Sequence, residues 1–148
     1  YVALSYAWGD ARSRRPLLVG KRQLQVTENL EVALRHLADD DQTLIIWVDA
    51  LCINQSDNVE KAVQVNRMGD IYRSASQVLV WLGLAADESD LAMQKLRSFF
   101  IRIDLPDYAD IFKAASDTEI AETFLFYGVV KLFRRPWFSR VWFRQEVV

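Results

Sequence analysis

The chain has 148 residues, the size of a single domain, and 51% of them are hydrophobic, which is enough for a sizeable core. A net charge of -2 excludes the strong positive field that nucleic acids or anionic membranes require, so we expect neither partner. No apolar run reaches the ~18 residues of a membrane span, and no signal peptide is visible. Together with a single cysteine, this pattern favours a cytoplasmic protein without an intrachain disulfide.

Residues 2–8 alternate in the manner of a β-strand, with large side chains on one face and small ones on the other. The small face, which includes Ser5, would let a helix approach closely. Beyond the strand, the loop at residues 11–15 carries three arginines. These arginines either hold phosphate groups in bidentate fashion or form a solvated basic loop, and the sequence leaves both open.

Residues 17–26 predict a β-hairpin, because Gly20-Lys21 separates two short alternating runs. Thr27 is a suitable N-cap for a helix whose apolar stripe has helical spacing and comprises Leu30, Ala33, Leu34 and Leu37. His36 lies beside that stripe, where we expect a surface histidine. It is the only histidine of the chain, and no cysteine cluster accompanies it, so we expect no metal site.

Residues 43–49 form an unbroken apolar run that ends at Asp49. Such a run is typical of a parallel strand buried on both faces, and it predicts the central strand of the sheet. Asn54 and Gln55 follow shortly, and Cys52 between them and the strand is expected to be a small core residue. In open α/β sheets ligands bind beyond the carboxyl ends of the strands, so this segment would supply one wall of a site.

The second half of the chain continues the alternation of helices and strands. Asp57 and Glu60 have the spacing of a capping box that opens a long helix to about Ala75, in which Gly69 would permit close packing. Residues 77–82 predict a second buried strand, reached by a right-handed parallel crossover. Further helices are expected at residues 87–101 and from Ser116 through residue 133.

Three sequence blocks follow one another along the chain. They are Tyr1-x-x-Leu4-Ser5-Tyr6-x-Trp8-Gly9, Trp47-Val48-Asp49-Ala50-Leu51-Cys52-Ile53-Asn54-Gln55, and Trp137-Phe138-x-Arg140-x-Trp142-x-x-Gln145-Glu146. This pattern resembles the fungal HET (heterokaryon incompatibility) domain over nearly the whole chain, least so at residues 85–134. The resemblance implies a single domain over residues 1–148, excerpted from a longer multidomain protein. Its implied role is regulated cell death after fusion of genetically different hyphae.

The chain is also distantly similar to TIR domains, which are flavodoxin-like signalling modules. Residues 2–6 would be the first TIR strand, and Trp142 precedes Glu146 by four residues, as in the TIR pattern. The resemblance implies a three-layer α/β fold, with a mostly parallel sheet flanked by helices and here an inserted β-hairpin. It also implies that Glu146 carries NAD glycohydrolase chemistry, with NAD as substrate and neither a cofactor nor a metal.

That chemistry builds oxocarbenium-like charge on the ribose, which a fixed carboxylate stabilises. We therefore expect Glu146 to be catalytic, Trp8 or Trp142 to stack on a ring, and arginines to meet the diphosphate. The complete expected substrate-binding set is Ser5, Tyr6, Trp8, Asp10, Arg12, Arg14, Asp49, Asn54 and Trp142.

A structural interpretation of the same residues stays open. In it, Glu146 pairs with Arg140 or Arg144, Asp49 caps the helix that follows it, and Asn54 forms a turn. The domain would then be a non-enzymatic signalling module that acts by self-association and by recruiting partner domains. Its contact surface would be the apolar helix at residues 117–133.

Overall fold

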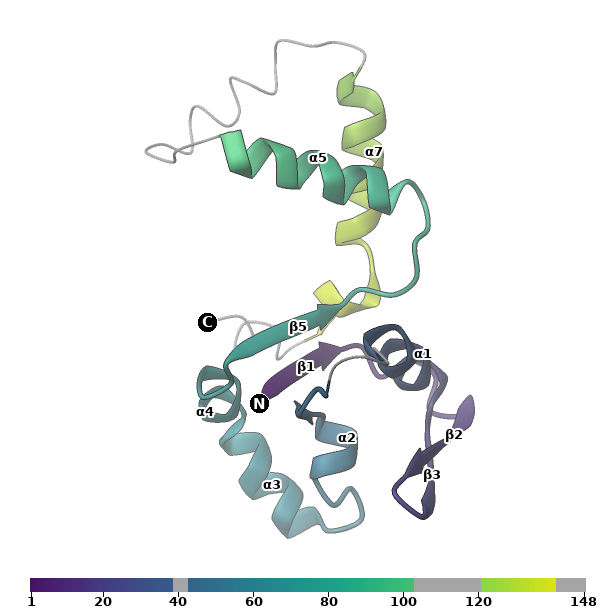
Figure 1. Cartoon of the computed structure of the whole chain (residues 1–148), viewed down its shortest axis with the longest axis vertical. Coiled ribbons are helices and arrows are strands. Elements are labelled where there is room, and N and C mark those ends of the chain that lie inside the picture. The colour runs from purple at the N-terminus through teal and green to yellow at the C-terminus, as the bar shows by residue number, and fades with distance from the viewer. Residues whose placement is uncertain (39–42, 103–120, 141–148) are drawn as a thin grey trace. The chain divides into compact units, whose positions relative to one another are not determined.

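Figure 1 shows a computed structural model of the chain, which describes residues 1–38, 43–102 and 121–140. The described residues divide into two compact units. One unit contains Tyr1–Gly83 and residues 136–140, and the other contains Leu84–Arg135. All the predicted site residues that are described belong to the first unit.

A parallel sheet forms the centre of the first unit. Its strands are β1 (Val2–Tyr6), β4 (Ile46–Trp47) and β5 (Gln77–Trp81), in the order β4-β1-β5. β1 pairs with β5 along its whole length and with β4 only at Val2 and Ala3. Helices flank this sheet, and a hairpin is inserted after its first strand, so the predicted α/β fold class is confirmed.

The alternation predicted for β1 divides the core into two clusters. Leu4 and Tyr6 face one cluster, which also contains Val26, Leu30, Ala33 and Val48. Ala3 faces the other cluster with Met68 and Tyr72. The small face of β1 does receive a helix, because the Tyr72 hydroxyl of α4 (Met68–Arg73) donates to the Leu4 carbonyl at 3.1 Å.

The prediction that residues 43–49 form the buried central strand is wrong. β4 contains two residues and lies at the edge of the described sheet, and Leu44 and Ile45 are 42% and 72% exposed. β1 is the central strand, with four consecutive buried residues and a partner on each side. An apolar run is compatible with a central strand and with an edge strand, so the sequence does not distinguish the two. The pairing of β4 stops early because Val48 is already the N-cap of α2 (Asp49–Cys52).

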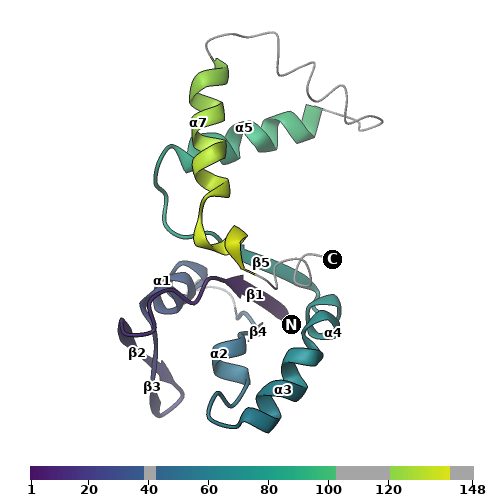
Figure 2. The same ribbon diagram turned by 180° about the vertical axis from the view of Figure 1, so that it is seen from behind.

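The predicted hairpin consists of β2 (Arg14–Val19) and β3 (Arg22–Thr27), as Figure 2 shows. Val19 pairs with Arg22, so Gly20-Lys21 is the two-residue turn, and Gly20 has the positive φ that such a turn requires. The helix α1 (Glu28–Leu37) follows directly, with Leu30 and Ala33 buried as the stripe predicts. Thr27 holds the N-cap position, but its side chain makes no capping hydrogen bond.

The single long helix predicted from Asp57 is instead two helices, α3 (Asn58–Asn66) and α4, which meet at Arg67. Asp57 caps α3 as predicted, because its carboxylate accepts from the N–H groups of Val59 and Glu60. α3 buries none of its residues, whereas α4 buries Met68 and Tyr72 against the sheet. The break lets the second helix turn its apolar side toward the core.

Two smaller expectations in this region are also wrong. Apart from the backbone of its own helix and its chain neighbours, nothing lies within 4 Å of the position that a Cβ would take at Gly69, so this glycine does not mediate close packing. Cys52 is exposed rather than part of the core, because it lies in the last turn of the short surface helix α2.

The second unit contains α5 (Ser89–Arg102) and α7 (Ala121–Phe133). Gly128 permits their close approach, since a Cβ there would lie 3.1 Å from the Ala92 Cβ and 3.3 Å from the Glu88 carbonyl oxygen. The predicted helix start at Ser116 lies outside the described residues. Within the described ranges, no helix is both long enough and apolar enough to cross a bilayer.

Candidate functional site

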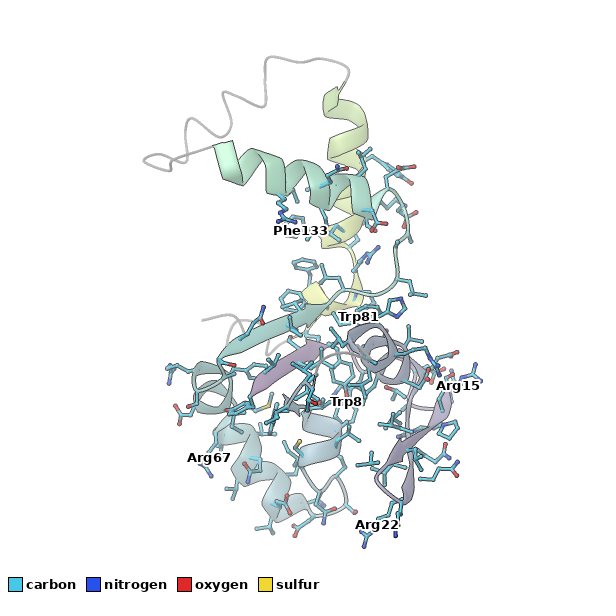
Figure 3. The ribbon with its side chains drawn as sticks, viewed as in Figure 1. Trp8, Arg15, Arg22, Arg67, Trp81 and Phe133 are labelled. Carbon is cyan, nitrogen blue, oxygen red and sulfur yellow. The ribbon has the colours of Figure 1, made fainter. Side chains whose placement is uncertain are left out.

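Two predicted site residues meet where β1 and β4 end. Trp8 follows β1, Asp49 follows β4, and the indole Nε1–H of Trp8 donates to Asp49 Oδ2 at 2.8 Å. Trp8, which Figure 3 labels, keeps 38% of its surface exposed, whereas Asp49 is 9% exposed. The carboxyl ends of parallel strands thus bring an aromatic ring and a carboxylate together, as strand-end sites do.

The chain immediately after Asp49 fixes this carboxylate. Its Oδ1 accepts from the Ala50 N–H at 2.7 Å, and the Gln55 side chain donates to the Asp49 carbonyl at 3.0 Å. Asp49 is also the first residue of α2, where the orphan N–H groups favour a negative charge. The carboxylate is therefore ordered before any ligand arrives.

The Tyr6 hydroxyl is buried and has no hydrogen-bond partner of normal geometry among the described residues. Burial, and then the nearby negative charge of Asp49, raise the pKa of this hydroxyl well above the usual value of a tyrosine. Tyr6 therefore stays protonated through neutral pH. The carboxylate of Asp49 interacts with this hydroxyl as an acceptor, and its interaction with the protonated form also raises the pKa of Tyr6.

On the opposite face of β1, Ser5 joins the opening block of the sequence to the closing block. Its Oγ accepts from the Trp137 indole N–H at 2.7 Å and from Arg140 Nη1 at 3.3 Å. Trp137 lies in the 3₁₀ helix η1 (Pro136–Ser139) and is buried. The first and the last of the three sequence blocks are therefore in contact, and the guanidinium of Arg140 lies near the carboxyl end of β1.

The arginine side chains of the basic loop form hydrogen bonds within the protein. Arg12 pairs with Asp10 through both its guanidinium and its backbone N–H, and these bonds lower the pKa of the Asp10 carboxyl. Arg14 donates to the Ala11 carbonyl at 2.8 Å and to the Gln25 carbonyl at 3.3 Å. The structure thus places Asp10 and Arg12 in a surface loop and Arg14 at the start of β2, each hydrogen-bonded within the protein.

Asn54 forms a turn, because its Oδ1 accepts from the N–H and the hydroxyl of Ser56 at 3.1 and 2.9 Å. The predictions for Glu146 and Trp142 lie outside the described residues. In the part of the chain that the structure describes, no three His, Cys, Asp or Glu side chains gather as a metal site would need.

Sequence reasoning missed Asn29, on the first turn of α1. Its side-chain amide donates to the Ala7 carbonyl at 2.5 Å, and its Oδ1 accepts from the Trp81 indole N–H at 3.0 Å. It therefore joins the end of β1 to the end of β5. No local sequence signal indicates this role, because both partners are distant in the chain.

A surface hollow of about 310 Å³ lies between β2 and α1 and is lined by none of the predicted site residues. Its walls carry the ion pairs Arg15–Glu28, at 2.8 Å, and Arg35–Glu31. These opposite charges neutralise one another in solvent, so the hollow offers no unbalanced charge to a ligand.

Comparisons with known proteins agree with the resemblance of the three blocks. The family model "Heterokaryon incompatibility protein (HET)" matches residues 1–146. The chain is 34% identical, over 178 aligned positions, to heterokaryon incompatibility protein 6, OR allele, of Neurospora crassa. The alignment covers 98% of this chain and 26% of that relative, and no solved structure matches. The chain thus belongs to the heterokaryon incompatibility (HET) family.

Proposed function

We propose that this chain is the signalling domain of a fungal protein that acts in heterokaryon incompatibility and triggers regulated cell death. The observation that supports this role is the family match over residues 1–146, together with the 34% identity to an incompatibility protein. The chain spans about a quarter of that relative's length, 26%.

For the biochemical activity, the proposal is hydrolysis of NAD at the edge where β1 and β4 end. The 2.8 Å contact between Trp8 and Asp49 supports it most directly, because it brings an aromatic ring and a fixed carboxylate to one place. In the reaction, the bond between ribose C1′ and the nicotinamide nitrogen breaks, and its electrons leave with nicotinamide. Water adds its oxygen to C1′ and releases a proton, and a carboxylate stabilises the positive charge in between.

The residues have separate roles in this proposal. Glu146 supplies the stabilising carboxylate, on the resemblance to TIR enzymes. Asp49 is suited to hold the ribose hydroxyls, because its carboxylate is an ordered acceptor. Arg140 donates to Ser5 near the carboxyl end of β1, and its guanidinium is suited to hold a phosphate.

The direct test is release of nicotinamide from NAD by the purified full-length protein in its assembled state. Glu146→Gln should lower the rate at least about 100-fold and Asp49→Asn should also lower it, with the fold intact by circular dichroism. Asp70→Asn is the matched control, since Asp70 is an exposed carboxylate paired with Arg73. An assembled wild-type protein that leaves NAD intact would exclude this activity.

A non-enzymatic alternative is favoured by the surface of α3. Val59 and Val63 lie one helical turn apart and are 76% and 51% exposed, and no residue of the helix is buried. Glu60 lies in the first turn of α3 and Arg67 directly follows its last residue, so antiparallel pairing with a second copy would oppose unlike charges. In this version the domain signals by self-association through α3.

Sedimentation of the full-length protein across a concentration series tests the alternative. Val59→Ser combined with Val63→Ser should weaken association, and Arg67→Glu should weaken it until Glu60→Arg is added. Val80→Ser, another exposed apolar residue, serves as the control. Self-association that these changes leave untouched would remove α3 from consideration.

A further inference from the structure

Trp8 is unusual in being held firmly while its ring stays open to solvent. The only polar atom of its side chain, the indole nitrogen, is bonded to Asp49, yet 38% of the surface of the residue is exposed. A tryptophan needed only for the core would bury its ring, because the indole contributes most of its stabilisation through apolar area.

The backbone before Trp8 is bonded to Asn29, and the backbone after it makes a turn that favours glycine. The side-chain amide of Asn29 donates to the Ala7 carbonyl. If position 9 carried a side chain, its Cβ would lie 3.3 Å from the Cβ of Asn29. Gly9 has φ +76°, a conformation that favours glycine, so the chain turns sharply directly after the ring. Any larger residue at position 9 would meet both strain and Asn29.

Asn29 is itself held from the other side, because its Oδ1 accepts from the Trp81 indole at the end of β5. Trp8 is therefore positioned by groups at the carboxyl ends of all three described parallel strands. β1 carries it, Asp49 after β4 bonds its N–H, and Asn29 connects its backbone to β5. The loss of conformational entropy on ordering this side chain therefore occurs when the protein folds and does not weaken the binding of a ligand.

We propose that Trp8 is a preorganised platform for the flat heteroaromatic ring of a ligand, and that Asp49 and Asn29 are the positioning residues that hold it. The inference rests on the proposed function in that a nucleotide is the ligand of this edge. Nicotinamide and adenine share the required chemistry, a planar π-system, and a rigid exposed indole is suited to stack on either.

Binding measurements on the full-length protein, without any turnover, test the platform. Nicotinamide, adenosine and ribose 5-phosphate are titrated separately by calorimetry into wild type, Trp8→Phe and Trp8→Leu. Trp8→Leu should weaken binding of at least one flat-ring ligand about 10-fold and leave ribose 5-phosphate unchanged, because only stacking is lost. Trp8→Phe should weaken it less, since a flat face remains.

The positioning role has its own readout. Nicotinamide, which has no ribose for Asp49 to hold, is the ligand for this test. Asp49→Ala and Asn29→Ala should each weaken nicotinamide binding in the wild type but add nothing in the Trp8→Leu background. Asp49→Asn should restore part of the loss, because its side-chain oxygen again accepts the indole N–H. Arg73→Ala, an exposed residue of α4, is the control. Equal loss of ribose 5-phosphate binding in Trp8→Leu would overturn the platform, as would additive effects in the double variants.

The two proposals can fail separately. Flat-ring binding that depends on Trp8, in a protein that leaves NAD intact, keeps the platform and excludes hydrolysis. Nicotinamide release that Trp8→Leu does not alter, with wild type binding neither nicotinamide nor adenosine, overturns the platform and keeps hydrolysis.

Discussion

Ser5 and Tyr6 are neighbours on β1 whose buried hydroxyls have opposite situations. Ser5 accepts a hydrogen bond from the buried Trp137 indole, whereas the Tyr6 hydroxyl has no partner of normal geometry among the described residues. Ser5→Ala should lower the free energy of unfolding by about 1–3 kcal/mol, because it removes the hydroxyl that accepts the buried indole N–H. Tyr6→Phe should change it by less than about 1 kcal/mol. Urea unfolding measures both, and a larger loss for Tyr6→Phe would contradict this account.

The same tyrosine predicts a pH dependence. Burial raises the pKa of Tyr6 in the folded state above the value of 10.0 expected in the unfolded chain. Above about pH 10 the unfolded state therefore binds fewer protons at this position than the folded state, so stability falls as the pH rises. Unfolding at pH 9 and at pH 11 should show a smaller alkaline loss in Tyr6→Phe than in wild type. Equal losses would indicate that Tyr6 does not contribute.

How far the sequence predicts single residues depends on whether their partners follow from a general rule. The meeting of Trp8 with Asp49 was predictable, because parallel strands end on the same edge of a sheet. Asn29 was not, because its contacts to Ala7 and Trp81 arise only when α1 packs across two strand ends. The arginine loop stayed undecided because a nearby acceptor, Asp10, competes with any ligand.

At the scale of elements, two helical glycines differ in what surrounds them. A Cβ at Gly128 of α7 would lie 3.1 Å from Ala92, whereas nothing lies within 4 Å at Gly69 of α4. Gly128→Ala should destabilise the packing of α5 and α7 by about 1–3 kcal/mol despite the better helix propensity of alanine. Gly69→Ala should instead stabilise by up to about 1 kcal/mol. Thermal unfolding compares them, and the same sign for both changes would contradict the packing argument.

Elements with a local signal were predictable from the sequence. The two faces of β1, the hairpin register and the stripe of α1 each follow from a period or a turn of a few residues. The position of β4 at the edge and the break at Arg67 were not predictable, because each depends on what packs against the element. An apolar run indicates that a strand packs on the core, but it does not indicate where that strand stands in the order of the sheet.

At the scale of the whole chain, the segment at residue 137 packs against β1, the first strand of the sheet. Trp137 is buried, and its contact with Ser5 spans 132 positions, so the first unit is closed by its last segment. The blocks indicated a domain over the whole chain, yet no local pattern indicated that its two end blocks touch.

That closure makes a prediction about where stability is lost. Trp137→Ala should cost the first unit about 3–5 kcal/mol, and Trp137→Phe less, because phenylalanine still fills much of the space. Hydrogen exchange should therefore show faster exchange of the β1 amides in Trp137→Ala. Met93→Ala, at a 49% exposed site on α5, is the control and should leave those amides protected. If β1 stays protected without the indole, then the pairing of β1 with its two neighbouring strands holds the unit together, and the closing segment is dispensable.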